Sequence, residues 1–263
     1  MERVRHYGMP PYRVAVVHGG PGAGGEMAPV ARALARERGV LEPIQTATSI
    51  DGQVEELRID LVTQGAPPLV LVGHSWGAWL IFILAAHHSR LVEKLVLVGS
   101  GPFEEAYVRR LHETRMGRLG EEERETFNAA VHALEDPTTK DRDAWLARLG
   151  TLAGKADAYD PITDRSEEAD RIGPTGDVFR AVWAEATRLR QRGELLALGR
   201  AIECPVVAIH GDYDPHPVEG VQEPLSAILE CFRFVLLSRC GHKPWIERQA
   251  RQTFFDVLEE ELI

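Results

Sequence analysis

The feature that most constrains the fold of this chain is a series of short runs rich in Val, Leu and Ile that alternate with helical periodicity. The run Leu69–Val72 is apolar at every position, which suits a strand buried under helices on both faces of a parallel sheet. The expected strands are Tyr12–Val17, a weak one near Pro43–Thr46, Leu69–Val72, Leu95–Val98, Pro205–Ile209 and Phe232–Leu237. The expected helices are Glu26–Glu37, Asp51–Thr63, Trp76–His87, Val218–Leu229 and Ile246–Glu260. This alternation predicts an α/β protein with a doubly wound, mostly parallel sheet.

One interval, from about Gly101 to Gly199, contains helical patterns and no strand candidate. The helices expected there are Ala106–Met116, Glu121–Leu134, Asp143–Leu152 and Val178–Leu198. An all-helical insertion between two strands predicts a lid placed before the last two strands of the sheet. We therefore expect residues 1–100 and 200–263 to form the core domain and residues 101–199 to form a helical cap.

Charge and composition exclude several classes of partner. The net charge of −10 argues against a nucleic-acid partner, because phosphate binding needs an excess of Lys and Arg. No segment approaches the roughly 20 apolar residues of a membrane span. Met1–Pro11 contains no apolar stretch of a secretory signal, so we expect a cytoplasmic protein. The three cysteines fit neither a disulfide framework nor a zinc site, so no metal is expected, and the oligomeric state stays open.

The strongest motif is Gly73-His74-Ser75-Trp76-Gly77, which fits Gly-x-Ser-x-Gly between a buried strand and a helix. A serine at such a sharp turn needs a strained backbone, and the flanking glycines remove the side chains that would crowd it. Its hydroxyl then projects above the carboxyl end of the sheet, where open α/β sheets bind ligands. The context predicts a nucleophile elbow with Ser75 as the nucleophile; the alternative is an ordinary helix N-cap serine.

A second motif, His18-Gly19-Gly20-Pro21-Gly22, ends the first expected buried strand. Acyl transfer requires N–H donors aimed at the developing oxyanion, and a glycine-rich loop can supply one. We expect the backbone N–H groups of Gly20 and Trp76 to form this oxyanion hole. His18 is expected to shape the loop through ring hydrogen bonds. The alternative is a simple Gly/Pro turn.

Two further motifs follow the last two expected strands: Gly211-Asp212-Tyr213-Asp214-Pro215 and Gly241-His242-Lys243-Pro244-Trp245. A serine hydroxyl needs an imidazole to remove its proton, and the imidazole needs a carboxylate to fix its tautomer. His242 is the expected base and Asp214 the expected orienting acid. Asp212 is the competing acid, although it is more simply explained as a turn-forming residue. Trp245, beside the histidine, is the expected substrate contact.

These residues resemble the α/β-hydrolase superfamily, over about two-thirds of the chain with the lid excluded. The motifs around Gly20 and Ser75 are most similar to the proline iminopeptidase branch. That resemblance implies Ser75, Asp214 and His242 as the catalytic triad, Gly20 and Trp76 as oxyanion donors, no cofactor, and a helical cap. It also implies acidic lid residues that hold the substrate's ammonium group, and the lid offers many acids, including Asp157, Asp160, Asp164, Glu167, Glu168 and Asp170.

The sequence therefore predicts a serine hydrolase that cleaves a carboxylic ester or amide of a small molecule or short peptide through an acyl-enzyme. The alternatives are a proline iminopeptidase, a carbon–carbon bond hydrolase and a non-catalytic ligand-binding protein on the same fold. The histidine before the serine, His74, resembles the general esterases more than the iminopeptidases, which usually carry glycine at this position. We also expect little room before Tyr12 for additional leading strands.

Overall fold

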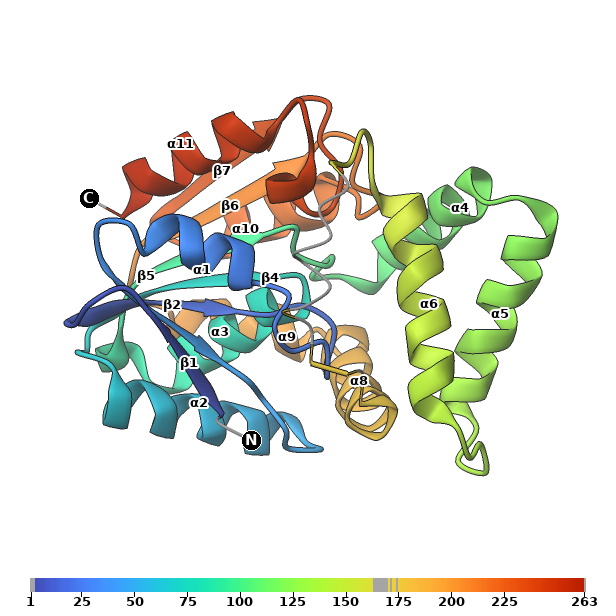
Figure 1. The fold of residues 1–263 in the computed structure, drawn as a ribbon, viewed down its shortest axis with the longest axis horizontal. Helices are drawn as coiled ribbons and strands as arrows, with labels where there is room; N and C mark the ends of the chain where they lie inside the picture. Colours follow the sequence, from blue (N-terminus) through green and yellow to red (C-terminus); the bar gives the residue numbers. More distant parts are fainter. Residues whose placement is uncertain (1–2, 163–169, 171, 174, 263) are drawn as a thin grey trace.

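The computed structural model describes residues 3–162, 170, 172–173 and 175–262. Its centre is a seven-stranded sheet with the order β1-β3-β2-β4-β5-β6-β7 (Figure 1). The strands are β1 Val4–Tyr7, β2 Tyr12–Val17, β3 Gly39–Pro43, β4 Leu69–His74, β5 Val92–Val98, β6 Val206–Gly211 and β7 Phe232–Leu237. Strand β1 is antiparallel to β3, and the other neighbours are parallel. The predicted doubly wound, mostly parallel sheet is confirmed.

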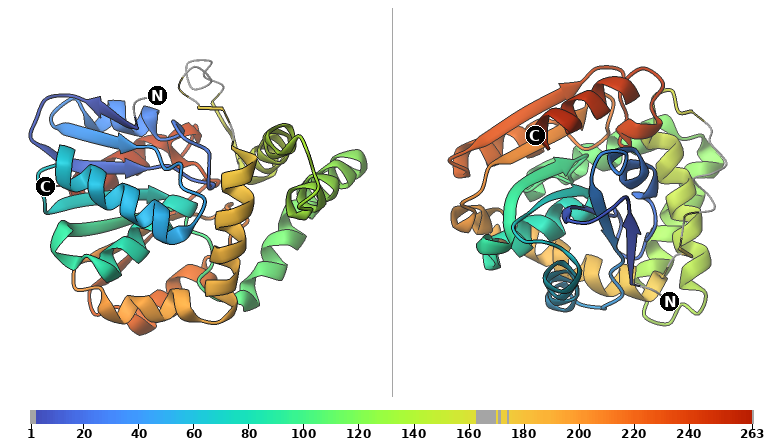
Figure 2. Two further views of the ribbon diagram at one scale, coloured as in Figure 1. Left: turned by 90° about the horizontal axis from the view of Figure 1, so that it is seen from below. Right: turned by 60° about the vertical axis from the view of Figure 1, so that its left-hand side comes forward.

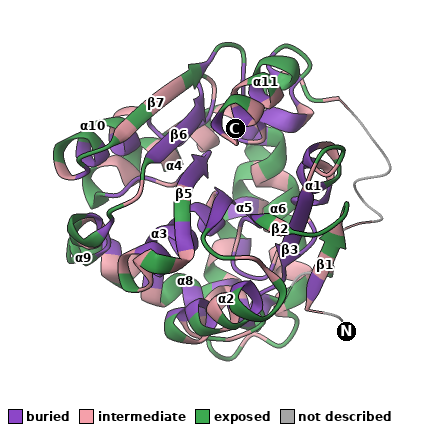
Figure 3. Ribbon diagram, turned by 90° about the vertical axis from the view of Figure 1, so that its left-hand side faces the viewer, coloured by how far each residue is buried: buried purple, intermediate pink, exposed green. Residues whose placement is uncertain are grey.

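The Leu-Val-Leu-Val runs divide their side chains between the two faces of the sheet. Leu69 and Leu71 of β4 pack with α2 Ile50–Gln64 and α3 Trp76–His87 in one buried cluster. Val70 and Val72 pack with α1 Ala28–Leu34 and α11 Arg251–Glu261 in the other. Alternate residues of a strand point to opposite faces, so a fully apolar run supports a helix layer on each side. Figure 1 shows the two layers, and Figure 3 shows the buried residues in the strands between them.

The amino-terminal part of the sheet differs from the prediction in two places. Strand β1 was not expected, and β3 lies at Gly39–Pro43 rather than near Pro43–Thr46. Glu42 explains the second error, because this charge interrupts the apolar run although its side chain is fully buried. Its carboxylate accepts a hydrogen bond of 2.8 Å from the Tyr7 hydroxyl of β1. The pairing with β1 therefore makes β3 possible, and neither strand is apparent from its own segment alone.

The remaining core helices lie close to their expected positions. Helix α3 is confirmed at Trp76–His87, and α10 spans Glu219–Ile228. The helix predicted to begin at Ile246 begins instead at Arg251, as α11, and Ile246 ends a 3₁₀ turn, η4 Pro244–Ile246. Two further 3₁₀ turns, η1 Ser89–Leu91 and η3 Leu198–Ala201, precede β5 and β6.

The named elements that the structure describes between β5 and β6 are all helices or 3₁₀ turns, joined by loops. It contains η2 Glu105–Tyr107, α4 Val108–Arg118, α5 Glu121–Glu135, α6 Arg142–Asp157, α8 Gly176–Gln191 and α9 Glu194–Ala197. Gly193, at φ +70°, ends the predicted helix Val178–Leu198 early and separates α8 from α9. In the described residues, no helix combines the length and the apolar character needed to cross a membrane.

The inserted helices pack in two groups. Helices α4, α5 and α6 share a small apolar cluster of their own, built around Leu119, Phe127 and Ala156. Helix α8 instead contributes Val178 and Val182 to the main core beside α3. Figure 2 shows α8 standing between the sheet and the other three helices. Within the predicted cap, α8 is thus anchored to the core, while the domain boundary at residues 101–199 stays a prediction.

Candidate active site

Ser75 lies at the turn between β4 and α3 with a strained backbone. Its φ of +53° is in the left-handed region, which few residues other than glycine adopt. A Cβ on Gly73 would overlap the backbone of Gly77, and a Cβ on Gly77 would overlap the carbonyl of Val17. Ser75 is only partly buried, whereas its neighbours on both sides are buried. The local geometry is therefore that of a nucleophile elbow, in which the two glycines allow the turn and the serine is accessible.

Asp214 and His242 form a buried hydrogen-bonded pair in the loops after β6 and β7. His242 Nδ1 donates to Asp214 Oδ2 at 2.8 Å, which places a proton on Nδ1, so that the neutral ring has its lone pair on Nε2. Burial opposes the charged form of Asp214, but the nearby imidazoles of His242, His216 and His210 hold the pKa of Asp214 well below its ordinary value. Burial likewise lowers the pKa of His242, but the charge of Asp214 outweighs it and raises that pKa.

The elbow and the His242 loop are joined through His74. The His74 ring lies 4.6 Å from the His242 ring, and His74 Nε2 donates to the His242 carbonyl at 3.1 Å. Gly99, at the end of β5, lies against both members of the Asp214–His242 pair. The structure thus brings the loops of Ser75, Asp214 and His242 together at the carboxyl edge of the sheet, as predicted from their positions after strands. Their assignment as a catalytic triad stays a prediction.

The glycine-rich loop after β2 lies over the elbow. A Cβ on Gly19 would come within 3.2 Å of the Ser75 Cβ. Gly20 has a φ of +34°, and its carbonyl accepts a turn hydrogen bond of 2.9 Å from Ala23. Trp76 is the first residue of α3, where backbone N–H groups have no partner within the helix. Trp76 therefore adjoins the serine, and Gly20 follows the residue that lies against it, while their role in an oxyanion hole stays a prediction.

The His18 ring forms hydrogen bonds with the backbone of this loop and of a neighbouring segment, as expected. Its Nδ1 donates to the Gly19 carbonyl at 2.9 Å, and its Nε2 accepts from the Gln45 N–H at 3.5 Å. Both contacts require the neutral ring, and burial lowers the pKa of His18 accordingly. The predicted loop-shaping role of His18 is confirmed.

Glu26 was not anticipated from the sequence, yet its largely buried carboxylate, just after the glycine-rich loop, contacts side chains of both the elbow and the His242 loop. Its Oε1 lies 2.9 Å from His74 Nδ1 and 3.0 Å from Lys243 Nζ. Burial opposes its charge, but Lys243 and His74 hold the pKa of Glu26 well below its ordinary value. Glu26 therefore forms an ion pair with Lys243 of the His242 loop and lies against His74 of the elbow.

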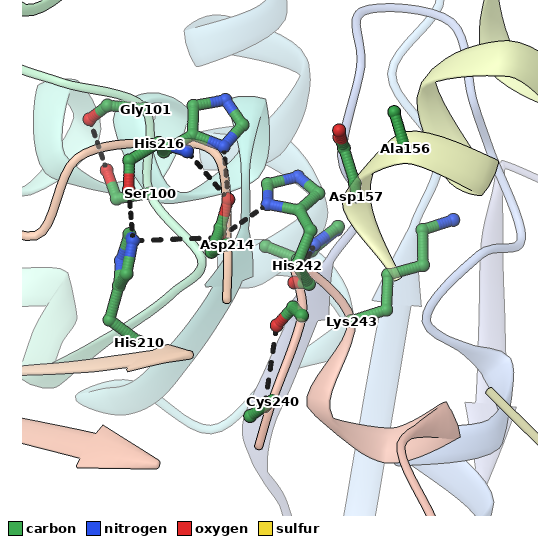
Figure 4. A network of polar contacts seen from close by, with 12 residues as sticks. Ser100, Gly101, Ala156, Asp157, His210, Asp214, His216, Cys240, His242 and Lys243 are labelled. Atoms are coloured by element: carbon green, nitrogen blue, oxygen red, sulfur yellow. Dashed lines mark hydrogen bonds and ion pairs between the residues drawn. The ribbon is translucent and has the colours of Figure 1, made fainter. Parts of the chain in front are cut away.

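His216 was also missed, although it binds the same carboxylate as His242. Its Nδ1 donates to Asp214 Oδ1 at 2.6 Å, and its backbone N–H donates to that oxygen at 3.0 Å (Figure 4). The His216 and His242 rings are stacked, with centroids 4.5 Å apart. The available signal was the Asp-x-His spacing, because Asp side chains often accept from the N–H two residues further on.

Among the described residues, one group of side chains could bind a metal ion: Asp214, His216 and His242. One potential ligand atom of each lies within 4.8 Å of those of the others. Two imidazoles and one carboxylate suit a transition metal. Both carboxylate oxygens, however, already accept ring N–H groups at 2.6 and 2.8 Å. A metal between these atoms would displace both protons, so hydrogen bonding accounts for the cluster without one.

The side chains of three further candidates bind or pack within the protein: Asp212, Trp76 and Trp245. Asp212 accepts from the Cys240 N–H at 3.1 Å and from the Ser238 hydroxyl at 3.2 Å, so its side chain binds the loop after β7 rather than the turn of its own that was expected. The Trp76 indole donates to Gln53 at 3.0 Å and is buried toward α2. Trp245 is 2% exposed and packs against His74 and Phe254 in the core. Trp245 therefore has a packing role in the structure. Its predicted contact with substrate stays a prediction, and the burial of its side chain does not support it.

The inserted helices reach the site through Asp157 at the end of α6. Its carbonyl accepts the His242 N–H at 2.9 Å, and its carboxylate accepts two hydrogen bonds from Arg115 of α4, at 2.8 and 2.6 Å. Two other lid acids also pair with arginines: Asp160 with Arg248, and Asp170 with Arg32. The candidate ammonium ligands Asp164, Glu167 and Glu168 lie outside the described residues.

Comparisons with known proteins agree with this geometry. Residues 14–257 match the model of the family described as "Alpha/beta hydrolase family". The crystal structure of VinJ is similar to the whole chain, with a TM-score of 0.71 and 18% identity over 99% of this chain and 95% of VinJ. A proline iminopeptidase from Mycobacterium smegmatis gives a TM-score of 0.64 and 18% identity over 98% of this chain and 93% of its own.

A thermophilic esterase from Thermogutta terrifontis gives a TM-score of 0.64 and 15% identity over 99% of this chain and 93% of its own. At these identities the solved structures establish a shared fold and no common substrate. No curated protein matches the sequence.

Proposed function

We propose that this chain, which belongs to the alpha/beta hydrolase family, is a serine hydrolase that cleaves a carboxylic ester or amide through an acyl-enzyme. The observation that carries the proposal is the buried hydrogen bond of 2.8 Å between His242 Nδ1 and Asp214, beside a serine on a strained elbow. That bond fixes the tautomer whose free Nε2 can act as a base. A packing role alone would not require the φ of +53° at Ser75.

In the proposed mechanism, Ser75 attacks the carbonyl carbon of the substrate while His242 Nε2 accepts the hydroxyl proton. The oxyanion accepts hydrogen bonds from the N–H groups of Gly20 and Trp76. Asp214 stabilises the imidazolium, which then protonates the leaving alcohol or amine. Water, deprotonated by His242, attacks the acyl-enzyme and releases the acid and the free serine.

Replacement of Ser75 tests this proposal. We expect Ser75→Ala to lower kcat for p-nitrophenyl esters on the order of 10⁶-fold, because the acyl-enzyme can no longer form. The variant should also escape labelling by a fluorophosphonate, which modifies only activated serines. Ser89→Ala, on the 3₁₀ turn before β5, is the matched control and should behave as the wild type. Undiminished labelling or turnover in Ser75→Ala would refute the assignment, and a wild type that resists the probe would favour a non-catalytic ligand-binding protein.

The class of substrate is part of the same proposal. A proline iminopeptidase needs an acidic lid residue for the substrate's ammonium group, and each of Asp157, Asp160 and Asp170 is already paired with an arginine. These three acids therefore give the iminopeptidase alternative no support beyond the motifs. A panel of nitrophenyl esters, aminoacyl-arylamides and vinylogous diketones separates the candidates. Selective cleavage of prolyl-arylamide would favour the iminopeptidase, and selective cleavage of the diketone would favour the carbon–carbon bond hydrolase.

A further inference from the structure

Asp214 carries two imidazole rings, one on each oxygen. Oδ1 accepts from His216 Nδ1 at 2.6 Å, and Oδ2 accepts from His242 Nδ1 at 2.8 Å. The rings are stacked at an interplanar angle of 25°, and all three side chains are buried. A catalytic triad of the proposed kind uses only one imidazole, so His216 is a buried titratable group that the proposed mechanism leaves unexplained.

The protonation state of His216 follows from its partner. A carboxylate oxygen only accepts, so the short contact requires a proton on His216 Nδ1. Burial is the largest influence on this ring and lowers its pKa to about 4, despite the charge of Asp214. The ring is therefore neutral in the range where His242 acts as a base. It donates to the carboxylate without adding a positive charge beside His242.

The connection between Asp214 and His216 is short and stiff. Pro215 separates them and fixes its own φ near −65°. The backbone N–H of His216 donates to the same oxygen as its ring, at 3.0 Å. His216 thus holds Oδ1 with two hydrogen bonds, whereas the terminal torsion of an unrestrained aspartate rotates over a broad range. With Oδ1 fixed, Oδ2 is directed at His242.

Other charged groups surround this arrangement on every side. His210 Nε2 lies 3.7 Å from Asp214 Oδ2 and donates to the His216 carbonyl at 2.9 Å. His74 faces His242 from the elbow. Arg115 and Asp157 face it from the inserted helices as a neutralised pair. None of these groups donates a hydrogen bond of ordinary length to Asp214 Oδ1, so His216 alone occupies that oxygen among the described residues.

We propose that His216 is a positioning residue that fixes the Asp214 carboxylate so that its second oxygen orients His242. The inference rests on the proposed serine hydrolase function. It assigns His216 no contact with substrate, since its action passes through Asp214.

Three substitutions separate the hydrogen bond from the ring. His216→Asn keeps an N–H donor close to the position of Nδ1 and removes the ring. His216→Phe keeps a stacked ring and removes the donor, and His216→Ala removes both. The probes are the rate constant for fluorophosphonate labelling of Ser75 and the kcat and KM for p-nitrophenyl butyrate. Thermal unfolding of each variant monitors folding.

We expect His216→Ala and His216→Phe to lower the labelling rate and kcat about 10- to 100-fold with KM nearly unchanged, because the base loses its orientation. His216→Asn should retain most of the activity. In the pH profile, the rate rises as His242 loses its proton. A weakened Asp214–His242 bond raises the pKa of His242 less, so the midpoint should move to lower pH in His216→Ala and His216→Phe but not in His216→Asn.

Several results would overturn the inference while the proposed function stands. One is that Ser75 is labelled in the wild type and is labelled equally fast in His216→Ala. A second is an active His216→Phe beside an inactive His216→Asn, which would assign the effect to the ring. A third is a midpoint that moves to higher pH, which would assign His216 to charge balance. If the wild type itself is not labelled at Ser75, the proposed function fails first.

A measurement on the wild type keeps the inference testable if a variant does not fold. Nitrogen-15 NMR of the histidines reports which ring nitrogen carries the proton. We expect His216 to be protonated at Nδ1 alone throughout the pH range of activity. A proton on Nε2, or titration of His216 together with His242, would overturn the proposal.

Discussion

At the scale of single residues, the space around the Asp214–His242 pair leaves no room for a side chain at the end of β5. Gly99 has a φ of +52°, and a Cβ there would lie 2.7 Å from the His242 carbonyl oxygen and 3.1 Å from His242 Nδ1. The same atom would approach Asp214 Oδ2 to 3.4 Å. A larger residue must therefore displace the imidazole, the carboxylate or β5 itself.

Gly99→Ala tests this crowding, with Gly193→Ala as its matched control. Gly193 also has a positive φ, +70°, but a Cβ there meets nothing within 4 Å. We expect Gly193→Ala to cost only the left-handed backbone, about 1–2 kcal/mol, and to leave kcat unchanged. Gly99→Ala should cost more and lower kcat, as measured by urea unfolding and ester hydrolysis. Equal effects of the two substitutions on stability and activity would contradict this account.

The residues of the site were predictable to different extents. Ser75, Asp214 and His242 stand in motifs that directly follow apolar strands, so their proximity could be predicted from the parallel sheet alone. Glu26 carries no such motif, because its role depends on contacts with His74 and Lys243 of two other loops. His216 carries only the short Asp-x-His spacing to its partner Asp214. A buried carboxylate or imidazole is recognised only when its partners are known.

At the scale of elements, Glu247 anchors the loop that carries His242 to the end of the inserted helices. Its fully buried carboxylate accepts backbone N–H groups from Gly241 at 3.0 Å, Tyr159 at 2.8 Å and Asp160 at 2.8 Å. Three hydrogen bonds to one charged group are individually stronger than neutral ones. The loop after β7 and the chain after α6 are therefore held as one unit.

Glu247→Ala should destabilise the protein by about 3 kcal/mol, because it leaves the buried N–H of Gly241 and the partly buried N–H groups of Tyr159 and Asp160 without an acceptor. Glu260→Ala, an exposed acid on α11, is the matched control and should change stability by less than about 0.5 kcal/mol. Urea unfolding measures both. We also expect Glu247→Ala to lower ester turnover at temperatures where it is folded. A Glu247→Ala variant as stable as Glu260→Ala would show that the three contacts are dispensable.

The predictability of the elements depends on how local their signals are. Strand β4, the Leu95–Val98 part of β5 and helix α3 are specified by uninterrupted apolar runs, and the glycine turn separates β4 from α3. The position of β3 depends on Tyr7 and Arg5 of β1, which bind Glu42 from another segment. The early end of α8 depends on one glycine with a positive φ. Such features arise from tertiary contacts or from single torsions, which hydrophobic periodicity does not report.

At the scale of the whole molecule, buried histidines link stability to pH. Burial lowers the pKa values of His18 and His74, and it lowers that of His216 from 6.5 to about 4. Below pH 6.5 the unfolded chain therefore binds protons that the folded chain does not, so the free energy of unfolding falls as the pH falls. The raised pKa of His242 acts oppositely, since its contribution is lost as the pH rises through that value.

These opposite contributions predict a maximum in the free energy of unfolding near the ordinary histidine pKa of 6.5. Between that pH and about 4, His216 alone should account for a loss on the order of 3 kcal/mol. Urea unfolding at a series of pH values measures the profile. His216→Asn should show a shallower decline on the acid side, and an unchanged slope in this variant would exclude His216 as a contributor.

The contact between the Asp157 carbonyl and the His242 N–H has a mechanical consequence. If the end of α6 swings outward to admit a ligand, it pulls on the backbone of the proposed base. An α6 displaced for ligand entry and a correctly oriented His242 would then not occur at the same time. Each outward movement of α6 would therefore stop proton transfer by His242 until the helix returned. The alternative is that α4 and α5 move while the last turn of α6 stays in place.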